Sequence, residues 1–330
     1  MIDSVLIKSY IAIQIPACFQ QKGRNMKKIL SLFFLMSVIA ITLFSCTQQE
    51  EPGFRFAFLT DIHIMTDNQA VPRFEKAIDK VNSMNPDFVI TGGDMIADAL
   101  GQNEEKATEY YQLFNSLLPQ FKMPVYETMG NHEVFGLYEK SGVQPENPLY
   151  GKAMYKEKLG EGKTWYSFDH KGWHFIILDG IGFTDDRQYI GYVNPEELKW
   201  LQRDLVETGK KTPIMVSIHI PLVSVMEQMQ NGSTAAASEG MVVTNSVDVI
   251  KAFEGYNLKL VLQGHLHIVE EIIYKDVHYI TGGAVSGAWW NGPKDGFPPG
   301  FVIVDIKGDG FDWSYETFND VVPQKPAAND

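Results

Sequence analysis

The amino-acid sequence predicts a layered α/β fold, in which helices cover a core of β-strands. Apolar runs of strand length alternate with segments of helical period between residues 54 and 262, a pattern typical of α/β domains. After residue 262, only strand-type runs follow. The composition, 45% apolar and 21% charged, is that of a folded globular chain and excludes a disordered or collagen-like one.

The first elements form a βαβαβ series. Strands are predicted at 54–60, 88–90 and 125–129, because each is a short and largely apolar run. Two helices between these strands are predicted from apolar residues that recur on one helical face. These residues are Phe74, Ala77, Ile78 and Val81 in the first helix and Tyr110, Phe114, Leu117 and Leu118 in the second.

The second half begins with a predicted hairpin, whose strands at 165–168 and 174–178 flank a turn. A helix then starts at Asn194, where a capping residue, a first-turn proline and an acidic residue three positions after the cap follow one another. A further helix is predicted at 247–253. The remaining strands are predicted at 214–218, 258–262, 269–274, 277–280, 301–306 and 311–316.

One domain over residues 52–318 is the simplest interpretation, because no repeat or linker interrupts this stretch. Its size suits a sandwich of two sheets. Residues 319–330 are expected to form a mobile tail. Residues 1–25 are expected to be a non-native upstream extension, with the true start at Met26, because they add nothing to the signal that follows.

Residues 26–46 have the features of a signal peptide. Two lysines precede an apolar run at 29–44, which is shorter than the roughly 20 residues that a membrane-spanning helix needs. The stretch at 43–46 resembles a bacterial lipobox, in which the cysteine is lipidated. We therefore expect an exported lipoprotein, anchored to the membrane through Cys46 and facing the periplasm or the cell exterior. An uncleaved signal anchor is the alternative.

Charge and cysteine content exclude several kinds of function. The net charge is −13, and removal of residues 1–45, with five basic and one acidic side chains, would make it −17. Such a chain lacks the basic surface of a general nucleic-acid binder, so phosphate chemistry here requires local positive charge, most simply metal ions. The two cysteines, Cys18 and Cys46, cannot form a disulfide framework or a cysteine-based zinc site.

Polar side chains that can bind metals follow five of the predicted strands, at the points where the strands end. They are Asp61, His63, Asp94, Asn131, His132, His219, His265 and His267. Ligands collect beyond the carboxyl ends of the strands in open α/β sheets, so we expect five consecutive parallel-type strands to deliver these residues to one crevice. Structural roles are expected for the remaining histidines, which are His170, His174 and His278.

This donor set fits two metal ions about 3.5–4 Å apart that share a bridging carboxylate and hold a hydroxide. Mixed nitrogen and oxygen donors suit Mn, Fe or Zn better than Mg or Ca. Glycines before Asp94, Asn131 and His265 are expected to let the backbone turn sharply. Each motif alone has an ordinary explanation, such as a turn or a hydrogen-bonded core histidine, so the prediction depends on their joint occurrence.

In this order, the motifs resemble those of the calcineurin-like metallophosphoesterases. The matching stretches are Asp61-x-His63, Gly93-Asp94, Gly130-Asn131-His132-Glu133, His219 and Gly264-His265-x-His267. The resemblance covers most of the predicted domain. It implies a four-layer α/β/β/α sandwich, a centre of two divalent or trivalent metal ions, and hydrolysis of phosphoric ester bonds.

The resemblance also implies a role for each matching residue. One metal site would consist of Asp61, His63, Asp94 and His267. The other metal site would consist of Asp94, Asn131, His219 and His265, so that Asp94 bridges the two ions and takes part in catalysis. His132 would contact the phosphoryl group and help to protonate the leaving oxygen without binding a metal. Asn131 and His132 are accordingly expected to contact the substrate.

One departure from a related group is informative. Purple acid phosphatases of this superfamily carry a tyrosine ligand three residues after the bridging aspartate, where this sequence has Ala97. We therefore expect no purple Fe(III)–tyrosinate colour. The pattern is closer to the cyclic-nucleotide-type and general bacterial phosphodiesterases.

Two segments outside these motifs are expected to form the substrate walls. Segment 221–244 lies between the fourth and fifth motifs and is expected to be a mobile lid. Segment 282–300 contains Trp289 and Trp290. Either these indoles stack on a base or sugar of the substrate, or one packs in the core and the other covers the final strands.

Four functional hypotheses remain. The leading one is an exported enzyme that hydrolyses phosphomonoesters or phosphodiesters of small molecules, nucleotides or glycans, using a hydroxide activated by two metals. The second is a nuclease of the same fold, which the acidic charge disfavours. The third is a non-catalytic surface binding lipoprotein with structural metals, which a non-ligand histidine at position 132 disfavours. The fourth is a membrane-anchored phosphodiesterase acting on phospholipids or the cell wall.

Overall fold

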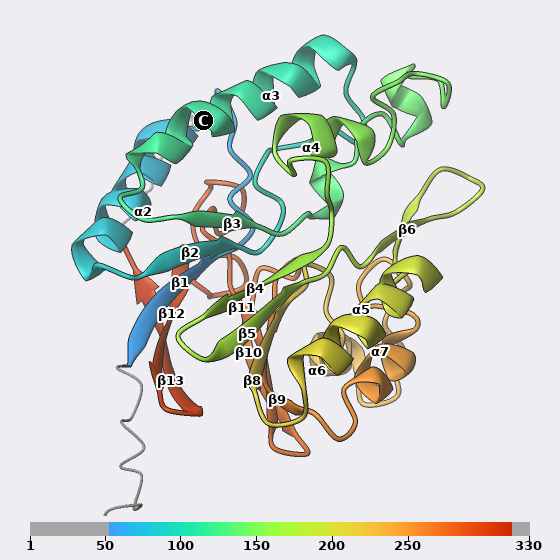
Figure 1. The fold of residues 1–330 in the computed structure, drawn as a ribbon. Coiled ribbons are helices and arrows are strands. Elements are labelled where there is room, and N and C mark those ends of the chain that lie inside the picture. Colours follow the sequence, from blue (N-terminus) through green and yellow to red (C-terminus); the bar gives the residue numbers. More distant parts are fainter. Residues whose placement is uncertain (1–52, 319–330) are drawn as a thin grey trace, which may run out of the picture. The chain divides into compact units, whose positions relative to one another are not determined.

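The computed structural model describes residues 53–318. The predicted extension at 1–25, the signal peptide at 26–46 and the tail at 319–330 lie outside the described residues. Within 53–318, two large β-sheets pack together and helices cover their outer faces (Figure 1). The predicted α/β/β/α sandwich is therefore confirmed. No helix between residues 53 and 318 combines the length and hydropathy needed to cross a lipid bilayer.

The first sheet contains three parallel strands from the start of the domain and two antiparallel strands from its end. Its order is β13 (Gly310–Thr317), β12 (Gly300–Lys307), β1 (Phe54–Leu59), β2 (Phe88–Thr91) and β3 (Val125–Glu127). Helices α2 (Ala70–Met84) and α3 (Glu104–Leu117) cover its outer face (Figure 1). Side chains alternate along β1, so that Phe56 and Phe58 face the second sheet while Ala57 and Leu59 face the helices.

The second sheet has four parallel central strands between two antiparallel edge strands. Its order is β10 (Val269–Tyr274), β11 (Val277–Gly282), β9 (Asn257–Gln263), β8 (Pro213–Ser217), β5 (Trp173–Ile177) and β4 (Tyr166–His170). Helices α5 (Pro195–Thr208) and α7 (Ser246–Ala252) cover its outer face (Figure 1). The Asn194 side chain accepts hydrogen bonds from the backbone N–H groups of Glu196 and Glu197, which confirms the predicted helix start.

The five strands that precede the metal-ligating residues do not form one parallel series, which corrects that expectation. β1, β2 and β3 belong to the first sheet, whereas β8 and β9 belong to the second. Their strand ends still meet at one edge because an apolar layer joins the sheets. In that layer, Phe56 stacks on Phe88 with ring centroids 5.2 Å apart and contacts the edge of Phe175 at 5.6 Å. Paired aromatic rings of this kind stabilise a core beyond their buried area.

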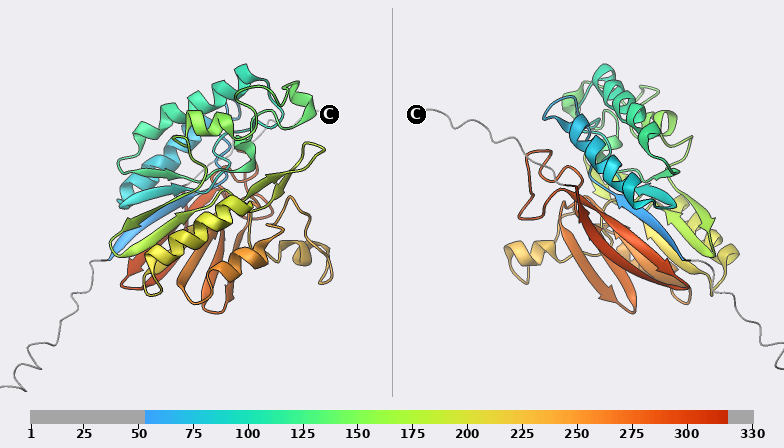
Figure 2. Two further views of the ribbon diagram at one scale, coloured as in Figure 1. Left: turned by 45° about the vertical axis from the view of Figure 1, so that its right-hand side comes forward. Right: turned by 90° about the vertical axis from the view of Figure 1, so that its left-hand side faces the viewer.

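Several short elements were not predicted from the sequence. They are the helices α4 (Ala153–Lys158) and α6 (Met226–Asn231), the paired strands β6 (Ile181–Phe183) and β7 (Tyr189–Gly191), and 3₁₀ turns at Leu118–Gln120, Asn131–Glu133 and Glu139–Ser141. Each is too short to show a hydrophobic period. Figure 2 shows that α6 projects from the body of the domain. The predicted strand at 125–129 ends at Glu127, because the chain turns there into the site.

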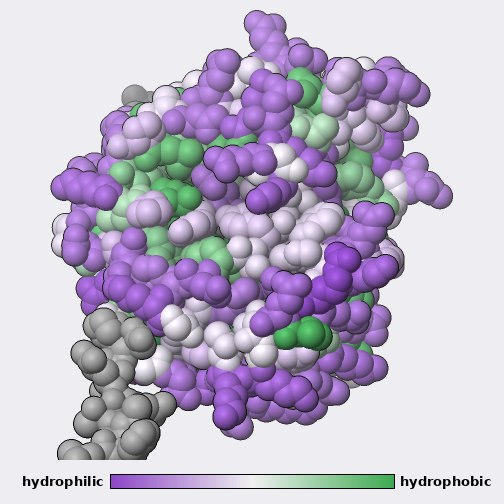
Figure 3. Space-filling view, in the orientation of Figure 1, coloured by the Kyte–Doolittle hydropathy of each residue, from purple (hydrophilic) through white to green (hydrophobic). Residues whose placement is uncertain are grey.

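Hydrophilic side chains dominate the face shown in Figure 3, and apolar residues on it form small, separate patches. Among the described residues, the large apolar side chains with high exposure are Phe183, Val206, Val225, Met229, Val247, Ile273 and Tyr274. They come from different elements. Single apolar residues of this kind are normal on the surface of a folded domain and need no functional explanation.

Candidate metal centre

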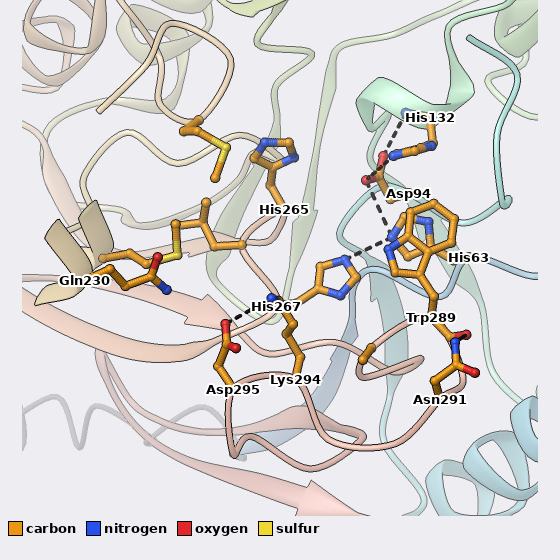
Figure 4. Close-up of a pocket in the computed structure, with 14 residues that line it drawn as sticks. His63, Asp94, His132, Gln230, His265, His267, Trp289, Asn291, Lys294 and Asp295 are labelled. Atoms are coloured by element: carbon orange, nitrogen blue, oxygen red, sulfur yellow. Dashed lines mark hydrogen bonds and ion pairs between the residues drawn. The ribbon is translucent and has the colours of Figure 1, made fainter. Parts of the chain in front are cut away.

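The predicted site residues converge at the edge where both sheets present the carboxyl ends of their parallel strands. Figure 4 shows His63, Asp94, His132, His265 and His267 around one pocket, whose volume is about 720 Å³. Asp61, Asn131 and His219 lie in the same strand-end loops and are buried. The eight residues therefore come from four loops of the two sheets and one short 3₁₀ turn.

Three groups of side chains place their donor atoms within 4.8 Å of one another. They are Asp61, His63 and His267; His63, Asp94 and His132; and Asp94, His219 and His265. The first and third groups are parts of the two metal sites that the sequence implied. Asp94 lies between them, with its Oδ2 atom 3.0 Å from His219 Nε2 and 3.8 Å from His63 Nε2. This is the placement that a bridging carboxylate requires.

Several buried donor atoms in this cluster have no hydrogen-bond partner among the described residues. They are Asn131 Oδ1, His265 Nε2, His63 Nδ1 and His132 Nδ1. Buried polar atoms almost always have a partner. Asn131 stands between Gly130 and His132, and the backbone N–H of His132 donates to Asp94 Oδ1 over 2.9 Å. Unpartnered nitrogen and oxygen donors beside a buried carboxylate are what a metal site requires.

Hydrogen bonds fix the orientation of two of the histidine rings. His219 Nδ1 lies 2.7 Å from the Gly92 carbonyl oxygen, and His267 Nδ1 lies 2.6 Å from the Gly287 carbonyl oxygen. A carbonyl can only accept, so each Nδ1 carries a proton. Each Nε2 is then directed at a carboxylate. Burial lowers the pKa of His219, but Asp94 outweighs this effect and raises the pKa to about 9, so a proton at Nε2 occupies the position that a metal ion would take. Metal-binding histidines commonly donate their second N–H in this way. Both Nε2 atoms face aspartates, with His267 Nε2 3.1 Å from Asp61 Oδ1.

Both aspartates are fully ionised despite their burial. Burial alone would raise the pKa of Asp61, but His267 and His219 outweigh it and hold this pKa at about 2. Burial also opposes the ionisation of Asp94, yet His219 and His132 keep its pKa well below the usual range. Two buried carboxylates held in the charged form favour a cation between them.

Two further histidines are held neutral. Burial, assisted by the charge of His219, lowers the pKa of His265 to about 4. Burial also lowers the pKa of His63 well below its ordinary value, against the opposing effect of Asp94. Neutral imidazole is the form that binds metals. The donor set therefore combines ionised carboxylates with imidazoles, of which His63 and His265 are held neutral, and this mixture suits transition metals better than Mg or Ca.

The backbone at these loops is unusual for residues other than glycine. The ligand-type residues with positive φ are Asp61 (55°), His63 (46°), Asp94 (52°), His265 (70°) and His267 (57°). Such conformations are uncommon outside glycine, and residues that adopt them cluster at functional sites, where the surrounding structure maintains them. The strain therefore supports a functional role for this edge of the sheets.

The glycines before Asp94, Asn131 and His265 were all expected to make sharp backbone turns, but only one of them does so. Gly93 has a φ of 94° and makes the sharp turn that was predicted. Gly130 and Gly264 do not have positive φ; they allow close approach instead. A Cβ at Gly130 would lie 2.2 Å from the Asp94 backbone nitrogen, and one at Gly264 would lie 2.0 Å from Thr60 Oγ1. Both distances are too short for any side chain.

Glu133 supports the site and was not assigned a role from the sequence. Its carboxylate is fully buried and accepts backbone N–H bonds of 2.7–3.1 Å from Gly130, Asp94, Met95 and Ile96. These bonds join the loop after β2 to the loop after β3. Burial and the charge of Asp94 raise the pKa of Glu133 to about 7, against the effect of the N–H donors.

We expect Glu133→Gln to weaken metal binding about 10- to 100-fold, the range usual for residues that orient metal ligands. Each carboxylate oxygen accepts from two N–H groups, so the amide NH₂ of glutamine would face two donors. Competition with a chromophoric chelator measures the affinity, and Glu139→Gln, at a 3₁₀ turn remote from these bonds, is the control. Equal affinity in the two variants would contradict this role.

Asp98 is a second residue that sequence reasoning did not identify. Its Oδ1 atom lies 3.6 Å from His132 Nδ1, and the backbone N–H groups of Leu100 and Gly101 donate to its carboxylate. Burial lowers the pKa of His132, but Asp94 and Asp98 reverse this effect and raise it. A partly exposed His132 between two carboxylates is suited to carry a proton.

The two tryptophans, for which the sequence left substrate stacking and core packing as alternatives, have different environments. Trp290 is 1% exposed, does not line the pocket, and donates from Nε1 to the His63 carbonyl oxygen over 3.1 Å. Trp289 lines the pocket and stacks on the His63 ring, with centroids 3.8 Å apart. Core packing therefore describes Trp290, while Trp289 remains available to a ligand.

The other histidines bind carboxylates away from this cluster, as expected for structural residues. His174 contacts Asp169 and Asp204 at 2.6 and 2.8 Å, while His170 contacts Asp87 at 3.2 Å. His278 contacts Glu271 at 2.7 Å. Segment 221–244, predicted as a substrate wall, contributes Met226, Gln230 and Met241 to the pocket.

Comparisons with known proteins agree with this geometry. Residues 54–269 match the family model described as calcineurin-like phosphoesterase. A Fibrobacter succinogenes protein described as a "probable cyclic nucleotide phosphodiesterase" is 21% identical over 178 residues, which are 52% of this chain and 59% of that protein. The match thus spans less than two thirds of the relative's length.

Solved structures share the fold at low sequence identity. A dimetal phosphatase from Danio rerio gives a TM-score of 0.55 at 13% identity, covering 81% of this chain and 99% of that one. GAP50, the anchor in the inner membrane complex of Plasmodium, gives 0.53 at 14% identity, covering 82% and 86%. Because the family model matches more than half of the sequence, the chain belongs to the calcineurin-like phosphoesterase family.

Proposed function

We propose that this protein hydrolyses phosphomonoesters or phosphodiesters with the help of two metal ions of the Mn, Fe or Zn type. The observation that carries the proposal is the pair of buried, unpartnered donors, Asn131 Oδ1 and His265 Nε2, beside the ionised Asp94 and its contact with His219. An acidic chain, whose pocket is lined by a single lysine, Lys294, that pairs with Asp295, needs cations to hold an anionic ester. The mixture of nitrogen and oxygen donors, and the match of residues 54–269 to the calcineurin-like phosphoesterase family, also support a metal-dependent phosphoesterase.

The residues fit two neighbouring metal sites. Asp61, His63, Asp94 and His267 would hold one ion, and Asp94, Asn131, His219 and His265 would hold the other. When bound, such ions supply Lewis acidity and lower the pKa of water, so that a nucleophile forms near neutral pH. Asp94 positions the two sets of ligands relative to each other, because His63 and His219 approach the same Oδ2 atom.

His132 is placed to serve the leaving group. Its Nε2 atom lies 3.9 Å from Asp94 Oδ2, and its side chain is 20% exposed toward the pocket. Asp94 and Asp98 favour its protonated form. We assign His132 the role of proton donor to the leaving oxygen and of a cationic contact for the phosphoryl group, a step that commonly contributes 10²- to 10⁴-fold.

The test is turnover by the purified protein after removal of metals with a chelator and reloading with Mn, Zn or Fe. p-Nitrophenyl phosphate and bis(p-nitrophenyl) phosphate are compared, because the F. succinogenes relative is described as a phosphodiesterase. We expect turnover of at least one ester to disappear on chelation and to return on reloading. Two tightly bound metals per chain without hydrolysis of either ester would overturn the proposal.

A further inference from the structure

The pocket extends well beyond the metal-ligating side chains. Its volume of about 720 Å³ falls in the range of sites that bury a complete small molecule, about 300–1,000 Å³. A phosphate group at the metal-ligating residues would fill only part of it. The remaining residues of the pocket are therefore placed to contact the group that is attached to the phosphate, and so to determine which esters bind.

One wall is the indole of Trp289. Its ring is nearly parallel to His63, at 3.8 Å and 23°, and meets the edge of His132 at 5.0 Å and 73°. Figure 4 shows the indole beside His63, on the side of the pocket that holds Asp94 and His132. The flat indole ring therefore lies next to His132, on the side of the pocket where the leaving group of the ester is expected.

The backbone at this position holds the indole in place. Trp289 and Trp290 have φ values of 53° and 65°, a conformation that bulky residues rarely adopt. Trp290 anchors the turn, because its indole donates to the His63 carbonyl oxygen, its ring packs under the Arg73 guanidinium at 5.2 Å, and its own carbonyl accepts from Arg73. Such strain is kept where the surrounding structure enforces it.

Two methionines supply apolar and adaptable lining in the same pocket. Met226 and Met241, from the segment between β8 and β9, line it together with the exposed Gln230. Figure 4 shows Gln230 on the opposite side of the pocket from Trp289. Unbranched thioether side chains adapt to ligands of different shape and make favourable contacts with aromatic rings.

We infer that Trp289, Met226 and Met241 form a subsite for a planar ring on the substrate, so that the preferred esters carry an aryl or nucleobase-type group. This inference rests on the proposed function for the position of the phosphate. A flat π-system stacks favourably on an indole face, whereas an aliphatic group is stabilised there only by the burial of its apolar surface. Lys294, which pairs with Asp295 over 3.0 Å, and Asn291 add polar groups to the lining of the pocket.

Phosphonates test the subsite without hydrolysis, because a carbon replaces the ester oxygen. Calorimetry on the metal-loaded protein compares phenylphosphonate with methylphosphonate and with cyclohexylphosphonate, which is apolar but not planar. We expect phenylphosphonate to bind about tenfold more tightly than methylphosphonate, the effect typical of stacking, and more tightly than cyclohexylphosphonate. Trp289→Ala and Met226→Ala should bring the phenyl-to-methyl ratio close to one, whereas Trp289→Phe should keep most of it.

Met229→Ala is the matched control, because Met229 lies on the same helix as Met226 but is 80% exposed and does not line the pocket. Its phenyl-to-methyl ratio should equal that of the unchanged protein. A ratio near one in the unchanged protein, or an unaltered ratio in Trp289→Ala, would overturn the subsite. So would loss of methylphosphonate binding in Trp289→Ala, because the indole would then act only by supporting His63.

These outcomes separate the subsite from the proposed catalysis. If the phosphonates bind with the expected ratio but neither p-nitrophenyl ester is hydrolysed, the subsite stands and the catalytic proposal fails. If the esters are hydrolysed but the phosphonates bind equally, the catalytic proposal stands and the subsite fails.

Discussion

Asp94→Ala is expected to remove metal binding and to reduce turnover at least about a thousandfold, which corresponds to about 4 kcal/mol of transition-state stabilisation. Asp94 Oδ2 is the atom that both His219 and His63 approach, at 3.0 and 3.8 Å, so its removal separates both sets of candidate ligands. The Asp94 side chain is 2% exposed, so water cannot easily replace it. Elemental analysis of the purified variant and steady-state kinetics give the two measurements.

The control for Asp94 is Asp309→Ala, which removes one carboxylate at the exposed turn between β12 and β13, where the side chain is 78% exposed. We expect full metal content and ordinary turnover in this variant. A thermal melt of both variants shows whether Asp94→Ala is folded. Full metal occupancy in folded Asp94→Ala would mean that the bridging carboxylate has been assigned to the wrong residue.

His132→Ala is expected to keep both metals and to lose about 10²- to 10⁴-fold in turnover. The substitution removes the imidazole but keeps the backbone N–H that donates to Asp94 Oδ1 over 2.9 Å, so the bridging carboxylate keeps its position. The loss should be smaller for p-nitrophenyl esters than for alkyl esters, because p-nitrophenolate leaves without a proton. Metal content and kcat for the two kinds of ester measure the effect.

Geometry leaves a clear alternative for His132, since its donor atom lies within 4.8 Å of those of His63 and Asp94. If His132 were itself a ligand, His132→Ala would lose metal in proportion to activity. His278→Ala is the control, because His278 contacts Glu271 on the far strands β10 and β11. It should lose neither metal nor turnover.

The regular elements could be predicted from the sequence because their apolar residues recur with a clear period. The run Phe54–Leu59 alternates between two buried faces, and α5 carries a capping residue, a proline and a buried leucine stripe. The pairing of strands into two sheets could not be predicted in this way. Parallel strands of either sheet have the same apolar pattern, and only tertiary contacts decide which strands are neighbours.

The candidate metal ligands could be predicted from the sequence because their residue types, histidine and aspartate, suit metal binding. Histidines and aspartates at strand ends indicate metal ligands wherever the strands are placed. Glu133 and Asp98 act through hydrogen bonds to backbone groups and to another side chain, and no spacing in the sequence records such contacts. The tryptophans show the same difficulty, because adjacent indoles look alike until the backbone sends Trp290 inward and leaves Trp289 at the pocket.

The division of the ligands between two sheets has a consequence for biosynthesis. A ribosome that has translated the 3₁₀ turn at Asn131–Glu133 has incorporated Asp61, His63, Asp94 and Asn131, but His219, His265 and His267 follow only after β8 and β9 have been made. A nascent chain that ends before residue 219 therefore carries an incomplete set of donors and can acquire neither ion in its final coordination. Acquisition of the inorganic component must then be a late event, after the second half of the polypeptide has been translated and has packed against the first.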